Sequence, residues 1–172
     1  TLSNFFAGIY LLADKPVRIG NYVRLEDGSE GYVEEIGWRS TKVKLLTDTT
    51  LIIPNSAFAQ QKIVNYYSRD GMIASVTIGA AYGSDPEKVE RVLLETADKV
   101  IENAHGTVRS FKPSVRLVNL ADSGLEYRIL FRIENFTDQW HVGNMMRKAM
   151  LKAFKKAKIE IPLPTRTLYM RK

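Results

Sequence analysis

The 172-residue chain contains no cysteine, which excludes disulfide bonds, thiolate metal sites and cysteine nucleophiles. This absence agrees with a reducing compartment. The two histidines, His105 and His141, lie far apart in the sequence, and neither belongs to a metal-binding motif. A phosphate-binding loop, a dinucleotide fingerprint and a nucleophile elbow are also missing. We therefore expect no bound metal and no cofactor.

Carboxylates are present, but they are not arranged as a catalytic pair. Glu34 and Glu35 are adjacent in a stretch that is predicted to be a strand. Their side chains therefore point to opposite faces of the sheet and cannot act together as an acid and a base. We expect that the protein is not an enzyme.

Long apolar runs are missing as well. A helix that crosses a bilayer needs about 20 apolar residues, and the longest candidate, residues 5–13, has about half that number. A secretory signal is not found, because the chain opens without a charged region and without a small-residue cleavage site. The missing Met and the abrupt apolar start suggest a fragment of a longer protein.

The chain is basic and rich enough in apolar residues to fold. Apolar residues make up 45% of it, which suits one ordinary domain or two small ones, and 25 Lys and Arg against 19 Asp and Glu give a net charge of +6. This charge favours anionic partners, either nucleic acid or a lipid surface. Much of the positive charge lies in one stretch that is predicted to be helical, at Arg147, Lys148, Lys152, Lys155, Lys156 and Lys158. Because no aromatic residues alternate with these cations as a stacking platform, we favour a solvated helix face over a phosphate-binding one.

The N-terminal segment is predicted to be a short helix. Residues 2–13 are nearly all apolar or small, with Asn4 as the polar exception. Pro16 disfavours helical geometry at Lys15, and the Lys15 cation suits the negative end of a helix. A helix that is apolar all round is either buried in a core or in lipid, and both remain open.

The next fifty or so residues are predicted to form a small barrel. Apolar residues alternate with a period of two, and turn residues separate five short strands at residues 22–26, 31–38, 41–46, 50–53 and 62–67. Pro54, Asn55 and Ser56 interrupt this pattern and can open a single helical turn. Barrels of the Sm-like and SH3-like types have this size, although the fold alone does not determine function.

A second domain is predicted after the linker at residues 68–71. It begins with a strand at residues 72–82 and a helix that is capped either by Ser84 with Glu87 or by Asp85 with Pro86 at its first position. Strands at residues 114–120 and 125–133, a helix at residues 138–158 and an extended piece at residues 165–170 follow. This order is that of a ferredoxin-like split βαβ unit. The apolar faces of the two helices are Val89, Val92, Leu93, Thr96, Ala97, Val100 and Ile101, and Val142, Met145, Met146, Ala149, Met150, Ala153 and Phe154.

Several strings of the sequence resemble the MscS-like family of small-conductance mechanosensitive channels. LSNFFAGI and DKPVRIGNYV, at residues 2–9 and 14–23, are similar to the end of the pore-lining helix and the entry into the barrel. IIPN and IVNY, at residues 52–55 and 63–66, are similar to the barrel signature of the family. The similarity continues through AYGSD, PSVRL and IEIPLP, which begin at residues 81, 113 and 159, and so covers essentially the whole chain.

The resemblance implies an α+β chain in three parts: the end of a pore-lining transmembrane helix at residues 1–15, an Sm-like barrel at 16–68 and a ferredoxin-like domain at 69–172. It implies the cytoplasmic vestibule of a homoheptameric channel in a bacterial or archaeal plasma membrane. Such a channel releases ions and small osmolytes under membrane tension in hypo-osmotic stress. Its expected partners are further copies of itself, membrane lipids and the permeating solutes, and no nucleic acid.

Candidate site residues follow from the same resemblance. Gly8 matches a glycine of the pore helix, where the missing Cβ allows close helix approach or bending. Asn4 and Asn55, the latter beside the signature residue Pro54, match two asparagines whose contact in the family is associated with inactivation. The residues themselves also allow Asn4 to be a helix cap and Asn55 a turn former. Membrane-interface or lipid-contact roles are expected for Phe5, Phe6, Tyr10, Lys15 and Arg18.

The chain departs from the family pattern at Asn21, where an acidic residue is usual, and at residues 47–50, where an Asp-Gly turn is common. The first departure weakens any argument for a salt bridge at that position. The alternative function is a soluble, ring-forming Sm-like protein that binds RNA. That alternative explains the barrel and the charge, but it does not explain the apolar N-terminal segment.

Overall fold

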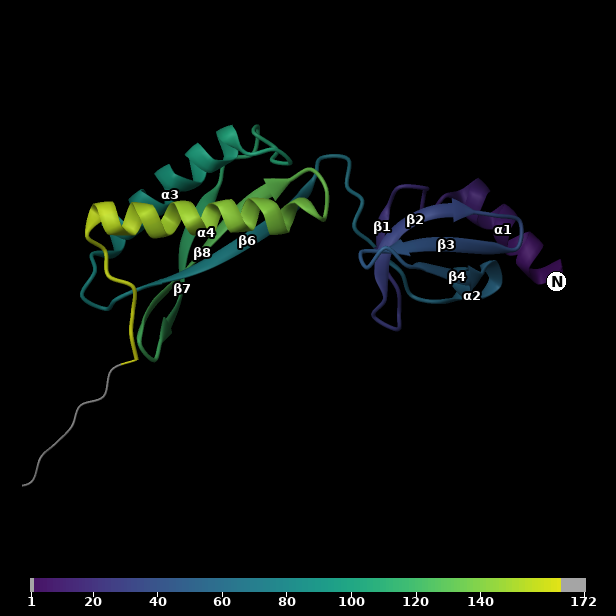
Figure 1. Cartoon of the computed structure of the whole chain (residues 1–172), viewed down its shortest axis with the longest axis horizontal. Helices are drawn as coiled ribbons and strands as arrows, with labels where there is room; N and C mark the ends of the chain where they lie inside the picture. The colour runs from purple at the N-terminus through teal and green to yellow at the C-terminus, as the bar shows by residue number, and fades with distance from the viewer. Residues whose placement is uncertain (1, 165–172) are drawn as a thin grey trace, which may run out of the picture. The chain divides into compact units, whose positions relative to one another are not determined.

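The computed structural model describes residues 2–164. Contacts between Cα atoms divide the chain between Arg69 and Asp70 into two compact units (Figure 1). The extended piece predicted at residues 165–170 lies outside the described residues. The predicted mixture of helices and sheets is confirmed.

The first unit combines two helices with a five-stranded antiparallel sheet in the order β4-β3-β2-β1-β5. In the described part of the chain the edge strands β4 and β5 do not pair with each other, so a closed barrel is not confirmed. The elements are α1 (Leu2–Asp14), β1 (Tyr22–Arg24), β2 (Glu30–Ile36), β3 (Ser40–Leu45), β4 (Thr50–Pro54), α2 (Asn55–Gln60) and β5 (Val64–Asn65).

Several elements of the first unit differ in length from their prediction, among them β5 and α2. The strand predicted at residues 62–67 is reduced to Val64 and Asn65, because only these residues pair with the three-residue strand β1. The helical turn expected after Pro54 extends to the six residues of α2. Helix α2 buries Phe58, which joins the core of the unit with Leu11, Val17, Val23, Leu25, Val33, Ile36 and Val43.

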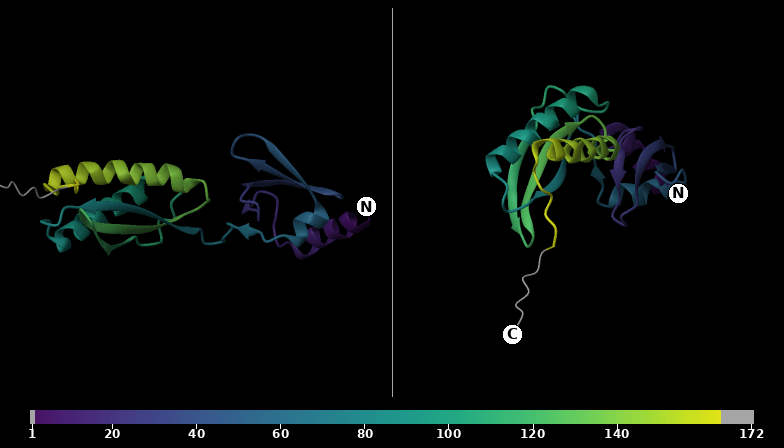
Figure 2. Two further views of the ribbon diagram at one scale, coloured as in Figure 1. Left: turned by 90° about the horizontal axis from the view of Figure 1, so that it is seen from below. Right: turned by 60° about the vertical axis from the view of Figure 1, so that its left-hand side comes forward.

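Helix α1 packs against the first unit along one narrow face, beside α2 (Figures 1 and 2). Asn4, Ala7, Gly8 and Leu11 are its buried or half-buried residues, and their spacing is that of one helix face. The helix ends at Asp14, as expected before Pro16, and Lys15 adopts a left-handed backbone with φ of 54°. The other side of α1 exposes Leu2, Phe5, Phe6, Ile9, Tyr10 and Leu12.

Tyr22 in β1 gives the first unit a pH-dependent stability. Burial, with smaller effects of Glu30, Tyr32 and Tyr66, raises the pKa of Tyr22 from 10.0 to about 12. The folded unit therefore keeps this phenol neutral at a pH where the unfolded chain ionises it. We expect the contribution of Tyr22 to stability to be complete below pH 10 and to be lost as the pH rises from about 10 to about 12.

Urea unfolding at a series of alkaline pH values measures this loss. In Tyr22→Phe the decline between pH 10 and 12 should be smaller, whereas the control Tyr67→Phe, at an exposed tyrosine, should keep it. An identical decline in Tyr22→Phe and in the unmodified chain would contradict the assignment.

The second unit covers one face of a three-stranded antiparallel sheet, in the order β6-β8-β7, with two helices (Figure 1). Its elements are β6 (Met72–Ala80), α3 (Pro86–Asn103), β7 (Ser114–Ala121), β8 (Gly124–Ile133) and α4 (Asp138–Ala157). The ferredoxin-like arrangement is not confirmed, because the strand expected to complete it lies outside the described residues.

The two helices of the second unit confirm the predicted apolar faces. All the predicted residues of α3 are buried except the half-buried Val92, and α4 buries Val142, Met146, Met150 and Phe154. The start of α3 decides between the two caps considered, because the Asp85 carboxylate accepts a hydrogen bond from the Glu87 N–H at 3.1 Å and Pro86 is the first helical residue. Against the helices lie Val76, Leu125, Tyr127, Ile129, Phe131 and Ile133 of the sheet.

Candidate functional site

Asn55 is a buried polar side chain at the start of α2, and three hydrogen bonds use its amide. Its Oδ1 accepts from the Thr41 hydroxyl at 2.9 Å, and its Nδ2 donates to the Gly37 carbonyl at 2.8 Å. The Asn55 side chain is 0% exposed, as is Thr41. The third bond runs from Nδ2 to the Asn4 carbonyl of α1 at 3.4 Å. Asn55, at the start of α2, therefore connects α1 to the turn between β2 and β3.

The side chain of Asn4 completes this connection through Ser56. Asn4 Oδ1 accepts from the Ser56 N–H at 3.0 Å and from the Ser56 hydroxyl at 2.6 Å. Asn4 is thus bonded to α2 instead of serving as a helix cap, and Asn55 has a role beyond shaping a turn. We call Asn4, Gly8, Thr41, Asn55 and Ser56 the helix clamp.

Gly8 allows α1 to approach the clamp closely. A Cβ added at Gly8 would lie 2.7 Å from Asn55 Nδ2, 3.2 Å from the Trp38 carbonyl oxygen and 3.3 Å from the Gly37 carbonyl oxygen. The Asn55 amide is buried and bonded on three sides, so it cannot move aside without losing hydrogen bonds. The structure therefore supports close approach, and not bending, as the reason for glycine at this position.

The predicted site residues divide into two groups in space. Asn4, Gly8 and Asn55 come together, with Pro54 as the residue that ends β4 and directly precedes α2. Phe5, Phe6 and Tyr10 are exposed on the other side of α1, where Phe6 is 59% exposed. No pattern in the sequence indicated Thr41, Ser56 or the Gly37 carbonyl, because their contacts depend on tertiary packing.

Lys15 and Arg18 lie together beyond the end of α1. They line a shallow groove of about 310 Å³ whose other walls are apolar, formed by Leu11, Leu12, Val17, Ile19 and Ile36. Neither cation forms an ion pair with a residue in the 2–164 range. The groove thus places two positive charges beside an apolar surface.

Asn21, one of the departures from the family pattern, has a structural role of its own. Its Oδ1 accepts from the Arg18 N–H at 3.0 Å and from Asn65 Nδ2 at 3.0 Å. Asn65 Nδ2 also donates to the Pro16 carbonyl at 3.2 Å. These bonds tie the segment after α1 to β5 without a salt bridge.

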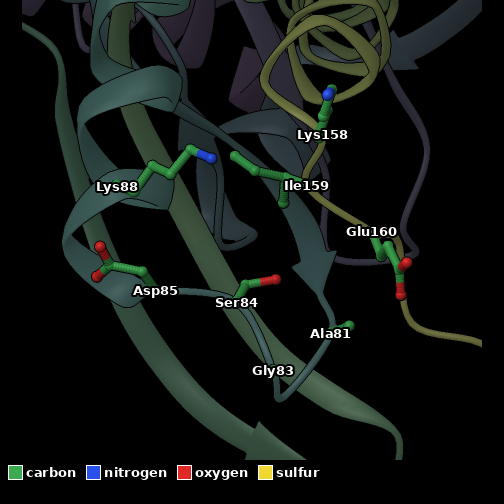
Figure 3. A pocket seen from close by; sticks show the side chains of 8 residues that line it. All are labelled: Ala81, Gly83, Ser84, Asp85, Lys88, Lys158, Ile159 and Glu160. Atoms are coloured by element: carbon green, nitrogen blue, oxygen red, sulfur yellow. The ribbon is translucent and has the colours of Figure 1, made fainter.

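The second unit contains a hollow of about 460 Å³ between the start of α3 and the end of α4. Figure 3 shows the Lys88 ammonium directed towards Ile159, with the carboxylates of Asp85 and Glu160 on opposite sides of the hollow. Among the described residues, no group of His, Asp and Glu is placed to hold a metal ion.

Known protein families give a direct comparison for both units. The family model for the β-domain of mechanosensitive ion channels matches residues 1–68, and the model for the C-terminal part of the mechanosensitive ion channel MscS matches residues 74–161. The chain belongs to the MscS family of mechanosensitive ion channels. The predicted resemblance is confirmed, and the family is one of channels, not of enzymes.

Individual MscS-family relatives agree with this assignment. The small-conductance mechanosensitive channel MscMJ of Methanocaldococcus jannaschii is 34% identical over all of the chain and 49% of its own length. The low-conductance mechanosensitive channel YnaI of Escherichia coli is 35% identical over 74% of the chain and 37% of its own length. The chain thus spans about half the length, or less, of these relatives. Nothing in the matches supports the RNA-binding alternative.

A solved MscS structure shows the same fold. The closed-state crystal structure of Helicobacter pylori MscS aligns with a TM-score of 0.79 at 22% identity, over 99% of this chain and 66% of that one. No helix among residues 2–164 has the length and apolarity to cross a membrane by itself.

Proposed function

We propose that the chain forms the cytoplasmic vestibule, with the last turns of the pore helix, of a channel that opens under membrane tension. The channel would release ions and small osmolytes in hypo-osmotic stress, in a bacterial or archaeal plasma membrane. The observation that carries this proposal is the helix clamp, which fastens one narrow face of an otherwise exposed apolar helix to the first unit. Membership of the MscS family supports it.

The proposed parts are the pore-helix end at residues 1–15, an Sm-like barrel at 16–68 and a ferredoxin-like domain at 69–172. Both edges of the five-stranded sheet, β4 and β5, lack a neighbour on one side within the described chain. Unpaired edges are suited to strands from other copies, as ring assembly requires. These edges support the proposed homoheptamer, with the side chains of Ile52 and Val64 exposed on the edge strands.

In this proposal, Asn4, Gly8 and Asn55 control gating or inactivation. A contact that forms in only one state shifts the equilibrium towards that state by its interaction energy. Tension on the helices upstream would pull α1, and the clamp would hold it in the non-conducting arrangement. Several hydrogen bonds, each with a net value of about 1 kcal/mol, suffice to shift such an equilibrium by more than tenfold.

Membrane contacts are proposed for the exposed side of α1. Phe5, Phe6 and Tyr10 present aromatic rings that suit lipid or the membrane interface. Lys15 and Arg18 supply the positive charges that suit lipid phosphates.

Osmotic survival tests the proposed function in cells. The full-length protein is expressed in bacteria that lack their own mechanosensitive channels, and survival is counted after a sudden drop in osmolarity. We expect survival to rise well above that of cells with an empty vector. Full-length protein that reaches the membrane without improving survival would contradict the proposal.

A further inference from the structure

The sheet of the second unit carries a pair of arginines on the face that points away from α3 and α4, where Pro162 packs near Gly79 and Gly124 at one end. Helices α3 and α4 cover the face that contains Tyr127 and Ile129, so alternate residues of β8 point to the other face. On that face the register places Arg128 directly opposite Thr77 of β6 and directly opposite Arg116 of β7. All three residues are exposed.

Two like charges at directly opposite positions of a sheet destabilise it, so their presence needs a reason. The nearest acidic residue along β8 on this face is Glu126, whose Oε2 accepts from Asn119 Nδ2 at 3.4 Å. Within residues 2–164 the ion pairs are Lys42 with Glu35 and Lys44 with Asp48, all of them in the first unit. The charges of Arg116 and Arg128 are therefore not neutralised by the described part of the chain.

A third arginine extends the positive face. Arg132 follows Arg128 by four residues on β8 and lies on the same face, and its guanidinium lies 4.7 Å from the centre of the Phe111 ring. Its Nε is buried and has no hydrogen-bond partner among the described residues. The ring thus holds Arg132 in place without neutralising it. Hydroxyl donors lie on the same face, at Ser75 and Ser114, which pair with Leu130, and at Thr77.

We propose that Arg116 and Arg128, with Thr77 beside them, form a binding site for a small doubly charged oxyanion such as phosphate. Guanidinium groups donate two parallel hydrogen bonds to an oxyanion, and one dianion neutralises two arginines at once. The bound anion would remove the repulsion between the two strands. The binding site does not depend on the proposed channel function, but its effect on permeation rests on that function.

A phosphate titration of the 172-residue chain tests the site. Sodium phosphate is added at pH 7.5 with sodium chloride adjusted to constant ionic strength, while the backbone amide NMR signals are followed. We expect saturable shifts centred on Thr77, Arg116 and Arg128. The double variant Arg116→Gln/Arg128→Gln should bind phosphate at least about tenfold more weakly. The matched control Arg91→Gln, at an exposed arginine of α3, should bind as the unmodified chain does.

Thermal unfolding gives a second readout. Phosphate should raise the melting temperature of the unmodified chain and of Arg91→Gln, but not that of the double variant. The proposal is overturned if phosphate and chloride act alike, if the shifts do not saturate, or if Arg91→Gln weakens binding as much as the double variant.

Permeation in the full-length protein separates this proposal from the proposed function. Under a potassium chloride gradient, the double variant should shift the reversal potential towards the equilibrium potential of potassium, because it removes two exposed positive charges from each chain. Absence of any tension-activated current would contradict the proposed function. The phosphate titration would then still test whether Arg116 and Arg128 bind the anion. A normal current without phosphate binding would overturn the site alone.

Discussion

Replacing Asn55 with alanine is expected to lower the free energy of unfolding of the first unit by about 3 kcal/mol. The substitution leaves the buried Thr41 hydroxyl and the half-buried Gly37 carbonyl without their present partner. Each buried polar group that loses its partner costs about 1–3 kcal/mol. Urea unfolding followed by Trp38 fluorescence measures the change. A Trp140→Phe background removes the tryptophan of the second unit from the signal.

Ser56→Ala is the matched control for this substitution. It removes the hydroxyl bond to Asn4 but keeps the bond from the Ser56 N–H, so its cost should be about 1 kcal/mol or less. Equal losses in the two variants would contradict the central position given to Asn55. In the full-length channel we expect current under sustained pressure to decline more slowly in Asn55→Ala, because the clamp no longer favours the non-conducting state.

Gly8→Val is expected to lower the free energy of unfolding of the first unit by about 2 kcal/mol, since overpacking of a filled contact costs about 1–3 kcal/mol. The new side chain would meet Asn55 Nδ2 and two backbone carbonyls, of which only the amide belongs to a side chain. Helix α1 must then move away from α2 or displace Asn55 from its hydrogen bonds. The same urea unfolding measurement applies.

Two comparisons isolate the close approach from general effects on the helix. Ala13→Val makes a similar change at an exposed position of α1 and should alter stability by less than about 0.5 kcal/mol. In a double-mutant cycle, Gly8→Ala should cost less when Asn55 is already alanine, because the nearest atom to the new Cβ is gone. Additive effects in this cycle would show that Gly8 and Asn55 do not act through one contact.

The elements predicted best from the sequence are those in which a regular apolar pattern continues over many residues. The apolar faces of α3 and α4 repeat over several turns, and every predicted position is buried or half-buried. The strand at residues 62–67 was predicted too long. Apolar residues occur along the whole stretch, but only Val64 and Asn65 pair with β1. The closed barrel and the fourth strand of the second unit remain proposals. The length of a short strand depends on which other strands it pairs with, and a local sequence pattern does not contain that information.

The candidate site came from the resemblance and not from spacing. Asn4 and Asn55 are 51 positions apart in the sequence. Their hydrogen bond forms only because the fold brings the start of α2 beside α1. Thr41 and Ser56 carry no local signal of their roles. The pairing of Arg116 with Arg128 likewise depends on the register of β7 and β8, which shifts at an irregularity between Leu117 and Asn119.

A pressure ramp on liposome patches that contain only the purified full-length protein tests the central claim most directly. The account predicts a current that is absent at rest and that appears reproducibly as suction raises the membrane tension. A folded and correctly inserted protein that stays silent up to the tension at which the membrane ruptures would contradict it.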